Sequence, residues 1–319
     1  MPQPSSPVPG ARARLAARAA LRLCAASLAL AACATADPPP LPVDEAAYRQ
    51  TLERFRAERR EEVNGPDGWN TLVGLFWLEL GASRVGSDST APVRLPADRS
   101  PAALGTVFVE GDSVRFDAAP GARVTVGGVP VQSLRLRTDA DSAQTVLAHG
   151  TLTLRVIRRG ERLALRVKDR EHPARTGFAG LRYFPVDTTW RIRARFVPSE
   201  RMDSVEIVNI VGMMEKQPSP GLIEFEAGGR RHTLRPVLER GSPELFVMFK
   251  DSTSSTDTYQ AGRYLYVSPP DSLGRVLLDF NRSYNPPCAF TAFATCPLPP
   301  RENHLPLRVA AGELRPAAH

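Results

Sequence analysis

The sequence contains little of what usually marks a catalytic or metal-binding chain. Its 319 residues include four cysteines and five histidines. The histidines are scattered and form none of the short spacings typical of zinc sites. There is no Gly-x-Ser-x-Gly elbow, no phosphate-binding Walker loop and no dinucleotide fingerprint. The sequence therefore predicts neither a metal site nor a cofactor.

An apolar run at residues 23–32 lies close to the N-terminus. It is shorter than the roughly 20 residues that a helix needs to span a bilayer. No acidic residue precedes Asp37, and four arginines come before the run: Arg12, Arg14, Arg18 and Arg22. The run ends in Leu30-Ala31-Ala32-Cys33, which is typical of a bacterial lipobox. We predict a lipoprotein signal peptide at residues 1–32 and lipidation of Cys33, with an ordinary signal peptide or a transit peptide as the alternatives.

The excess of positive charge is small once this leader is removed. The formal net charge of the chain is +7, and the four arginines of the leader supply four of these charges. The mature chain then carries +3, with no long block of lysine and arginine and no zinc-finger spacing. A strongly basic surface is the usual mark of a nucleic-acid-binding protein. We therefore predict no nucleic-acid partner.

Residues 33–43 are rich in proline and predict an extended tether between a lipid anchor and a folded body. Two or more acyl chains would hold such a protein stably on a membrane. Ala34 occupies the position at which an aspartate tends to retain Gram-negative lipoproteins in the inner membrane. We predict a lipid-anchored protein of the bacterial cell envelope, on the periplasmic face of the outer membrane if the source is Gram-negative. Its predicted partners are the membrane and a small-molecule or glycan ligand.

Residues 44–64 have the pattern of an amphipathic helix. Tyr48, Leu52 and Phe55 recur at the helical period, and charged residues fill most of the other positions. The Gly-Pro-Asp-Gly sequence at 65–68 then ends the helix. We expect the apolar stripe of this helix to pack on the first β-rich lobe.

Beyond the helix, apolar and polar residues alternate with the period of a β-strand. Leu152, Leu154 and Val156 alternate with polar residues, and the chain turns at Arg159-Gly160 into a second alternating strand. This pattern predicts a hairpin with one apolar face and one wet face. The chain as a whole predicts an all-β fold, a mainly antiparallel sandwich or barrel in two β-rich lobes at residues 65–172 and 173–319, with one N-terminal α-helix.

Two glycine-containing turns give the first lobe a sequence pattern that resembles that of forkhead-associated sandwiches. They are Val85-Gly86-Ser87 and Val126-Gly127-Gly128-Val129. Ser87 stands where those domains carry the arginine that reads phosphothreonine, and no Ser-x-x-His follows. The resemblance implies a sandwich fold for residues 65–172, without phosphopeptide binding.

A set of polar residues near the C-terminus forms the candidate site. Four of them lie at the end of a predicted strand and in the loop after it, and three lie on the neighbouring predicted hairpin. The seven candidates are Asp251, Tyr259, Arg263, Asp279, Asn281, Tyr284 and Asn285. Such side chains often satisfy the backbone of a proline-rich loop. The alternative is a ligand pocket, and a catalytic role within that pocket stays open.

Cys288 and Cys296 lie in the same segment, with seven residues between them. In an oxidising envelope such a pair predicts a disulfide, which would stabilise the fold by roughly 2–3 kcal/mol. Two packed thiols, metal ligation and a catalytic thiol are the alternatives. No paired histidine is evident that would activate either thiol.

Four motifs carry a resemblance to a known family. They are GLFWLELG at 74–81, FAGLRYFPVDTTWR at 178–191, TYQAGRYLYV at 258–267, and DFNRSYNPPCAF with CPLPPREN at 279–303. From Trp69 to the end, the chain resembles the bacterial family known as domain of unknown function 1684. The resemblance implies a β-rich protein with no assigned activity, and it weakens the argument for the disulfide. We expect a binding or structural module, with a hydrolase-like enzyme that uses the 279–288 loop as the alternative.

Overall fold

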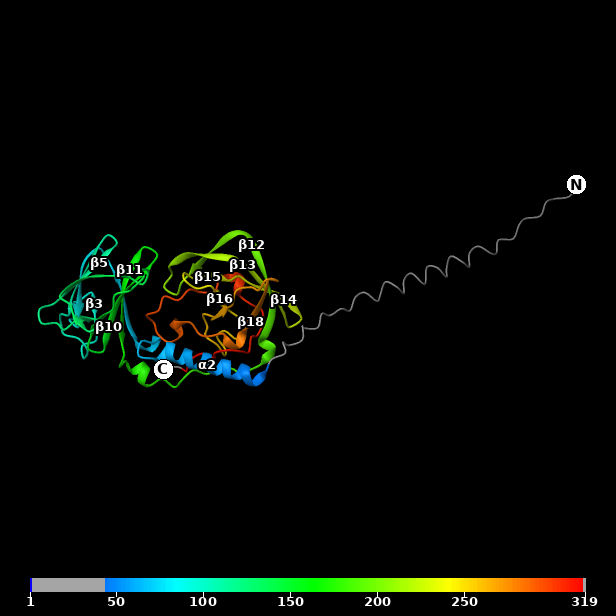
Figure 1. The fold of residues 1–319 in the computed structure, drawn as a ribbon, viewed down its shortest axis with the longest axis horizontal. Coiled ribbons are helices and arrows are strands. Elements are labelled where there is room, and N and C mark those ends of the chain that lie inside the picture. The colour runs from blue at the N-terminus through cyan, green and yellow to red at the C-terminus, as the bar shows by residue number, and fades with distance from the viewer. Residues whose placement is uncertain (2–43, 318–319) are drawn as a thin grey trace.

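The computed structural model describes Met1 and residues 44–317, which form one long helix and two β-rich lobes (Figure 1). The predicted signal peptide, Cys33 and the tether lie outside the described residues. Within residues 44–317, no helix is both long enough and apolar enough to cross a membrane. The predicted fold class is confirmed, because the sheets are almost entirely antiparallel and the long helix lies at the N-terminal end.

The first lobe is a sandwich of two sheets. The larger sheet has the order β1-β11-β10-β9-β6-β7. Its strands are β1 (Leu72–Leu78), β6 (Thr125–Val126), β7 (Val129–Pro130), β9 (Leu147–His149), β10 (Leu152–Arg159) and β11 (Arg162–Asp169). The smaller sheet has the order β3-β2-β4-β5-β8. Its strands are β2 (Gly81–Gly86), β3 (Val93–Arg94), β4 (Gly105–Glu110), β5 (Ser113–Ala118) and β8 (Ser133–Leu136).

The core of this lobe follows from the alternation in the sequence. Leu152, Leu154 and Val156 are buried on one face of β10, and β10 pairs antiparallel with β11 through the tight turn at Gly160. Gly160 has φ +58°, a conformation that glycine adopts without a steric penalty. The predicted hairpin is therefore confirmed. Its polar face, however, is partly covered by the second lobe.

The second lobe contains a sheet with the order β14-β13-β12-β18 and a second sheet with the order β15-β16-β17. Its strands are β12 (Arg191–Val208), β13 (Met214–Ala227), β14 (Arg230–Leu234), β15 (Val237–Leu238), β16 (Leu245–Phe249), β17 (Arg263–Val267) and β18 (Arg275–Asp279). Short helices complete the chain: α3 (Pro173–Thr176), η1 (Trp69–Thr71), η2 (Thr188–Trp190), η3 (Phe280–Arg282), η4 (Pro287–Ala289) and η5 (Arg301–Asn303). A buried cluster that includes Phe225, Phe249 and Phe280 packs between the sheets.

Helix α2 (Glu45–Asn64) runs along the second lobe (Figure 1). The Tyr48 hydroxyl donates to the Asp279 carboxylate over 2.8 Å, and Arg59 forms an ion pair with Glu313 over 3.1 Å. The expectation that this helix packs on the first lobe is wrong. Its buried stripe contains Arg59, and the partner of that arginine lies 254 positions further along the chain. A prediction from local periodicity assigns an arginine to the polar face of a helix, and it cannot identify an ion-pair partner so far away in the sequence.

The C-terminal segment of the described chain is bound into the second lobe. His304 forms an isolated parallel bridge with Lys250, and Glu313 forms an antiparallel bridge with Tyr183. The Glu313 side chain is fully buried. Helix α2 and the C-terminal segment therefore lie beside each other on this lobe, joined by the ion pair between Arg59 and Glu313 (Figure 1).

Candidate functional site

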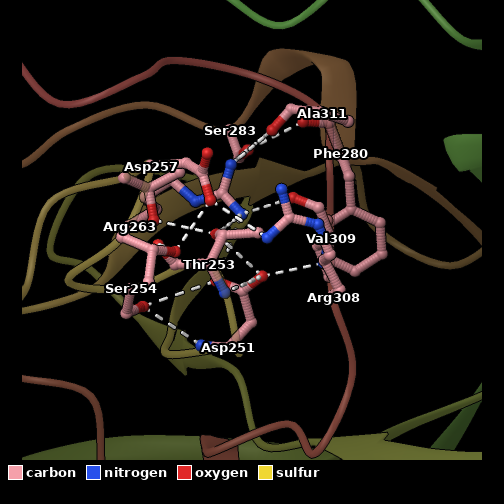
Figure 2. A network of polar contacts seen from close by, with 12 residues as sticks. Asp251, Thr253, Ser254, Asp257, Arg263, Phe280, Ser283, Arg308, Val309 and Ala311 are labelled. Atoms are coloured by element: carbon pink, nitrogen blue, oxygen red, sulfur yellow. Dashed lines mark hydrogen bonds and ion pairs between the residues drawn. The ribbon is translucent and has the colours of Figure 1, made fainter.

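Arg263, one of the seven predicted site residues, is a fully buried structural arginine (Figure 2). Its guanidinium donates to the carbonyl oxygens of Val309, over 3.0 Å, and Ala311. It also donates to Ser283 Oγ over 3.2 Å and forms an ion pair with Asp251 over 3.3 Å. Burial lowers the pKa of Arg263, and the Asp251 charge opposes that effect. The side chain therefore fastens the C-terminal segment to β17 and faces no open space.

Asp251 completes this network from the neighbouring turn (Figure 2). Its carboxylate accepts hydrogen bonds from Thr253 Oγ1 over 2.9 Å and from the Val309 backbone N–H over 2.8 Å. Thr253 Oγ1 lies 2.9 Å from Thr258 Oγ1, which closes the turn. The structure thus brings Asp251 and Arg263 together, as the sequence suggested, but in a hydrogen-bonded cluster within the protein.

Asp279 and Asn281 belong to a separate network under α2. Asp279 accepts from the Tyr48 hydroxyl and lies 3.7 Å from Arg191 Nε. Burial raises the pKa of Asp279. The Asn281 side chain bonds both backbone groups of Asp187, donating over 2.8 Å and accepting over 3.2 Å. Both predicted site residues are thereby used to hold α2, η2 and η3 in place.

Asn285 and Tyr259 also satisfy backbone groups. The Asn285 backbone N–H donates to the Glu313 carboxylate over 2.9 Å, and its side chain donates to the Leu314 carbonyl over 2.8 Å. The Tyr259 hydroxyl donates to the Cys288 carbonyl over 2.9 Å. Six of the seven predicted residues therefore hold the fold together in separate groups. Tyr284 is the exception.

Cys288 and Cys296 are free thiols in the structure, the first half-buried and the second buried. The Cys288 backbone N–H donates to Cys296 Sγ over 3.1 Å. A hydrogen bond between the two side chains lowers the pKa of Cys288 and raises that of Cys296. Across the described part of the chain, no group of three or more His, Cys, Asp and Glu side chains could hold a metal ion.

Tyr284 lines a cleft of about 350 Å³ between the two lobes. Aromatic side chains cover much of its wall: Trp69, Phe246, Tyr264, Tyr266 and Tyr284. The Tyr266 and Tyr284 rings are stacked at 6.3 Å with an interplanar angle of 19°, and Tyr266 is partly exposed. Ligand pockets commonly have volumes of roughly 300–1,000 Å³, are mostly apolar and contain a few polar groups. The cleft falls within this range of volume, and its wall combines aromatic rings with charged and polar side chains.

Charged side chains enter the cleft from both lobes. Arg159 of β10 and Arg166 of β11 come from the first lobe. Glu215 and Glu239 come from the second lobe, and Glu62 comes from α2. No ion pair among the described residues joins these two arginines to these three glutamates. Opposite charges therefore remain separated across the cleft.

Arg166 carries the least compensated of these charges. Its guanidinium carbon lies 5.5 Å from the centroid of the Trp69 ring, and its buried Nε has no hydrogen-bond partner. Burial, helped by the charge of Arg159, lowers the pKa of Arg166 to about 10. The alternation in β11 placed Arg166 on a wet face. Sequence reasoning missed its role because the lobe that covers this face follows later in the chain.

All six tyrosines of the chain are packed or hydrogen-bonded so that burial raises each phenol pKa above its ordinary value of 10.0. They are Tyr48, Tyr183, Tyr259, Tyr264, Tyr266 and Tyr284. Unfolded phenols ionise near pH 10, so the folded state binds more protons above that pH. This contribution to stability is complete below pH 10 and is lost as the pH rises towards the folded pKa values.

We therefore expect the unfolding temperature to fall steeply above about pH 10. Tyrosinate absorbance should rise together with unfolding and should show no separate step near pH 10 in the folded protein. The unfolding temperature of the Tyr284→Phe variant should fall less over the same pH interval, because this variant has one buried phenol fewer. Stepwise ionisation of several tyrosines near pH 10, with the far-UV circular dichroism unchanged, would contradict this.

Fold and site together define a two-lobed β protein with an aromatic, charge-lined cleft between the lobes. Residues 176–314 match the family described as "Protein of unknown function (DUF1684)". The match covers most of the second lobe and supports the resemblance to this family there. The motif at 74–81 lies outside the matched segment. A search of curated proteins finds no significant match.

Solved structures give further similarities. An uncharacterised protein of Haloarcula marismortui, solved by NMR, is 32% identical, over 44% of this chain and 78% of that one, with a TM-score of 0.38. An FHA domain studied for phosphothreonine-dependent interactions is 18% identical, over 31% of this chain and 96% of that one, with a TM-score of 0.22. The FhaA FHA domain is 17% identical, over 29% and 96%, with a TM-score of 0.21. Scores of this size carry no argument about function.

Proposed function

We propose that the chain is a lipid-anchored binding protein of the bacterial cell envelope and that its ligand site is the interlobe cleft. The leader pattern ending at Cys33 supports the anchor. The observation that carries the binding role is Arg166, a cation in the cleft wall that has no carboxylate partner among the described residues. A charge withdrawn from water without a partner costs free energy. A bound ligand with an acidic group would recover part of that cost.

A binding role is favoured over hydrolysis by the chemistry of the cleft wall. Nucleophilic catalysis needs a nucleophile beside a base that lowers its pKa. The thiol in the wall is Cys296, and its pKa is raised by the hydrogen bond with Cys288. The residues of the 279–288 loop proposed for a hydrolase pocket donate and accept within the protein, apart from Tyr284.

Native mass spectrometry tests both the lipid anchor and the binding role. The full chain is expressed with its leader in a bacterial host and purified from membranes in detergent. The denatured protein should begin at Cys33 and carry acyl chains, and the native protein should carry an additional mass that denaturation releases. The Cys33→Ala variant should lose the acyl mass and keep the released mass. The Gln217→Trp variant, which narrows the cleft, should lose only the released mass. An unacylated wild-type protein would contradict the anchor.

A further inference from the structure

The charges of the cleft follow a simple rule. Every charged side chain that the first lobe contributes is an arginine, and every one from α2 or the second lobe is a glutamate. Two arginines facing three glutamates would be expected to form ion pairs if the walls touched. Within the described part of the chain, none of these pairs comes within ion-pair distance. The space between the walls therefore separates an acidic side from a basic side.

Some of these groups are already occupied by neighbours. Arg159 pairs with Asp139 over 2.7 Å and donates to Thr295 Oγ1 over 3.0 Å. Glu62 pairs with Arg59, and Glu239 accepts from the Tyr266 hydroxyl. These contacts leave two charges of the cleft with neither an ion pair nor a side-chain hydrogen bond to a described residue.

Arg166 on the basic side and Glu215 on the acidic side are those two charges. Arg166 is half-buried, and comparison with the buried arginines of the described chain shows what is unusual about it. Arg263 has Asp251 and Arg59 has Glu313. Glu215 is half-buried on β13, where it pairs through the backbone with Ile207 of β12. The structure thus offers one uncompensated cation and one uncompensated anion in the same cleft.

Rings line the space between these charges. Tyr266 and Tyr284 present stacked rings, and the Trp69 ring lies beside the Arg166 guanidinium. An aromatic wall favours the binding of a ligand that carries a flat or apolar ring, and the faces of tyrosine rings also attract an ammonium group.

We infer that the cleft binds a small amino-acid-like zwitterion that carries a ring. The ligand carboxylate pairs with Arg166, its ammonium group pairs with Glu215, and its ring packs on Tyr266 and Tyr284. This inference rests on the proposed binding function. It adds the chemical class of the ligand, which can be a free amino acid or a short peptide with both ends charged.

A matched set of small probes tests each part of the inference by isothermal titration calorimetry. L-Phenylalanine has all three groups, 3-phenylpropionate lacks the ammonium, phenethylamine lacks the carboxylate, and L-alanine lacks the ring. We expect phenylalanine to bind about tenfold more tightly than each of the other three. A charge-assisted hydrogen bond is worth roughly a factor of ten or more, and so is the burial of a phenyl ring. Tighter binding of phenylalanylglycine than of phenylalanine would assign the ligand to peptides, and the reverse would assign it to free amino acids.

Two substitutions should have opposite effects on these probes. Arg166→Gln should weaken phenylalanine and 3-phenylpropionate about tenfold and leave phenethylamine unchanged. Glu215→Gln should weaken phenylalanine and phenethylamine and leave 3-phenylpropionate unchanged. Arg162→Gln is the matched control, because this exposed arginine of β11 lies over Trp77 and outside the cleft. It should leave all four probes unchanged. A purely structural effect would weaken every probe alike.

The outcomes separate the inference from the proposed function. Equal binding of phenylalanine and 3-phenylpropionate would overturn the zwitterion, as would an Arg166→Gln variant that binds normally. If no probe binds while native mass spectrometry finds a released mass, the inference fails and the binding function stands. If no probe binds and no mass is released, both fail.

Discussion

Replacing Arg263 with methionine is expected to lower the free energy of unfolding by about 3–5 kcal/mol, because it leaves the Asp251 carboxylate buried without its cation. The substitution also removes donors from the carbonyls of Val309 and Ala311 (Figure 2). Urea denaturation followed by circular dichroism measures the change. The C-terminal segment should lose protection from amide hydrogen exchange in the same variant.

A surface ion pair provides the matched control. Arg275 and Asp271 are paired over 2.8 Å, and both side chains are about half exposed. Arg275→Met should therefore cost less than about 1 kcal/mol. The double variant Arg263→Met/Asp251→Asn should recover part of the loss, because no buried charge then lacks a partner. A loss for Arg263→Met no larger than for Arg275→Met would show that the network contributes little.

Replacing Arg59 with methionine is expected to release α2 from the second lobe, at a cost of about 3–5 kcal/mol. The variant leaves Glu313 buried without its ion pair, and it removes the guanidinium that lies 4.2 Å from the centroid of the Tyr284 ring. Hydrogen exchange across Glu45–Asn64 measures the release directly. Arg60→Met, an exposed change on the same helix, is the control and should leave exchange unchanged.

The cost of the Arg59 substitution should depend on pH. Burial raises the pKa of Glu313 above its ordinary value of 4.5 even in the presence of Arg59. A raised folded pKa means that the protonated carboxyl favours the folded state, so its stabilising effect is complete below pH 4.5 and is lost as the pH rises through the folded pKa. The difference between wild type and variant should therefore shrink on acidification. A difference that is constant from neutral to acidic pH would contradict the assignment of the cost to Glu313.

Sequence periodicity predicted the fold class because every second residue of a sandwich strand is buried and therefore apolar. The β10–β11 hairpin is an example, with Leu152 and Leu154 inside. Alternation does not show which polar face a later lobe will cover, and Arg166 was therefore placed in solvent. The placement of α2 failed for the same reason, since its ion-pair partner Glu313 is remote in sequence.

The sequence left two roles open for the candidate site residues, and the structure shows the first of them, hydrogen bonding within the fold, for most of these residues. Asn281 and Asn285 are polar residues next to restricted backbone, and such a pattern fits both a pocket and a set of hydrogen bonds to the backbone. The deciding partners, Asp187 and Leu314, lie 94 and 29 positions away. Tyr284 alone was both predicted and found at the cleft, because its ring reaches the interlobe wall.

The contact of α2 with the C-terminal part of the second lobe has a consequence for the order of folding. The first lobe pairs strands within residues 72–169 and needs no later part of the chain. The second lobe joins Tyr48 to Asp279 and Arg59 to Glu313, separations of 231 and 254 residues. Contacts between such remote residues form slowly, because a long loop must close first. The first lobe is thus free to fold early, while the cleft is completed only when its last wall residues, Thr295, Cys296 and Pro297, are in place.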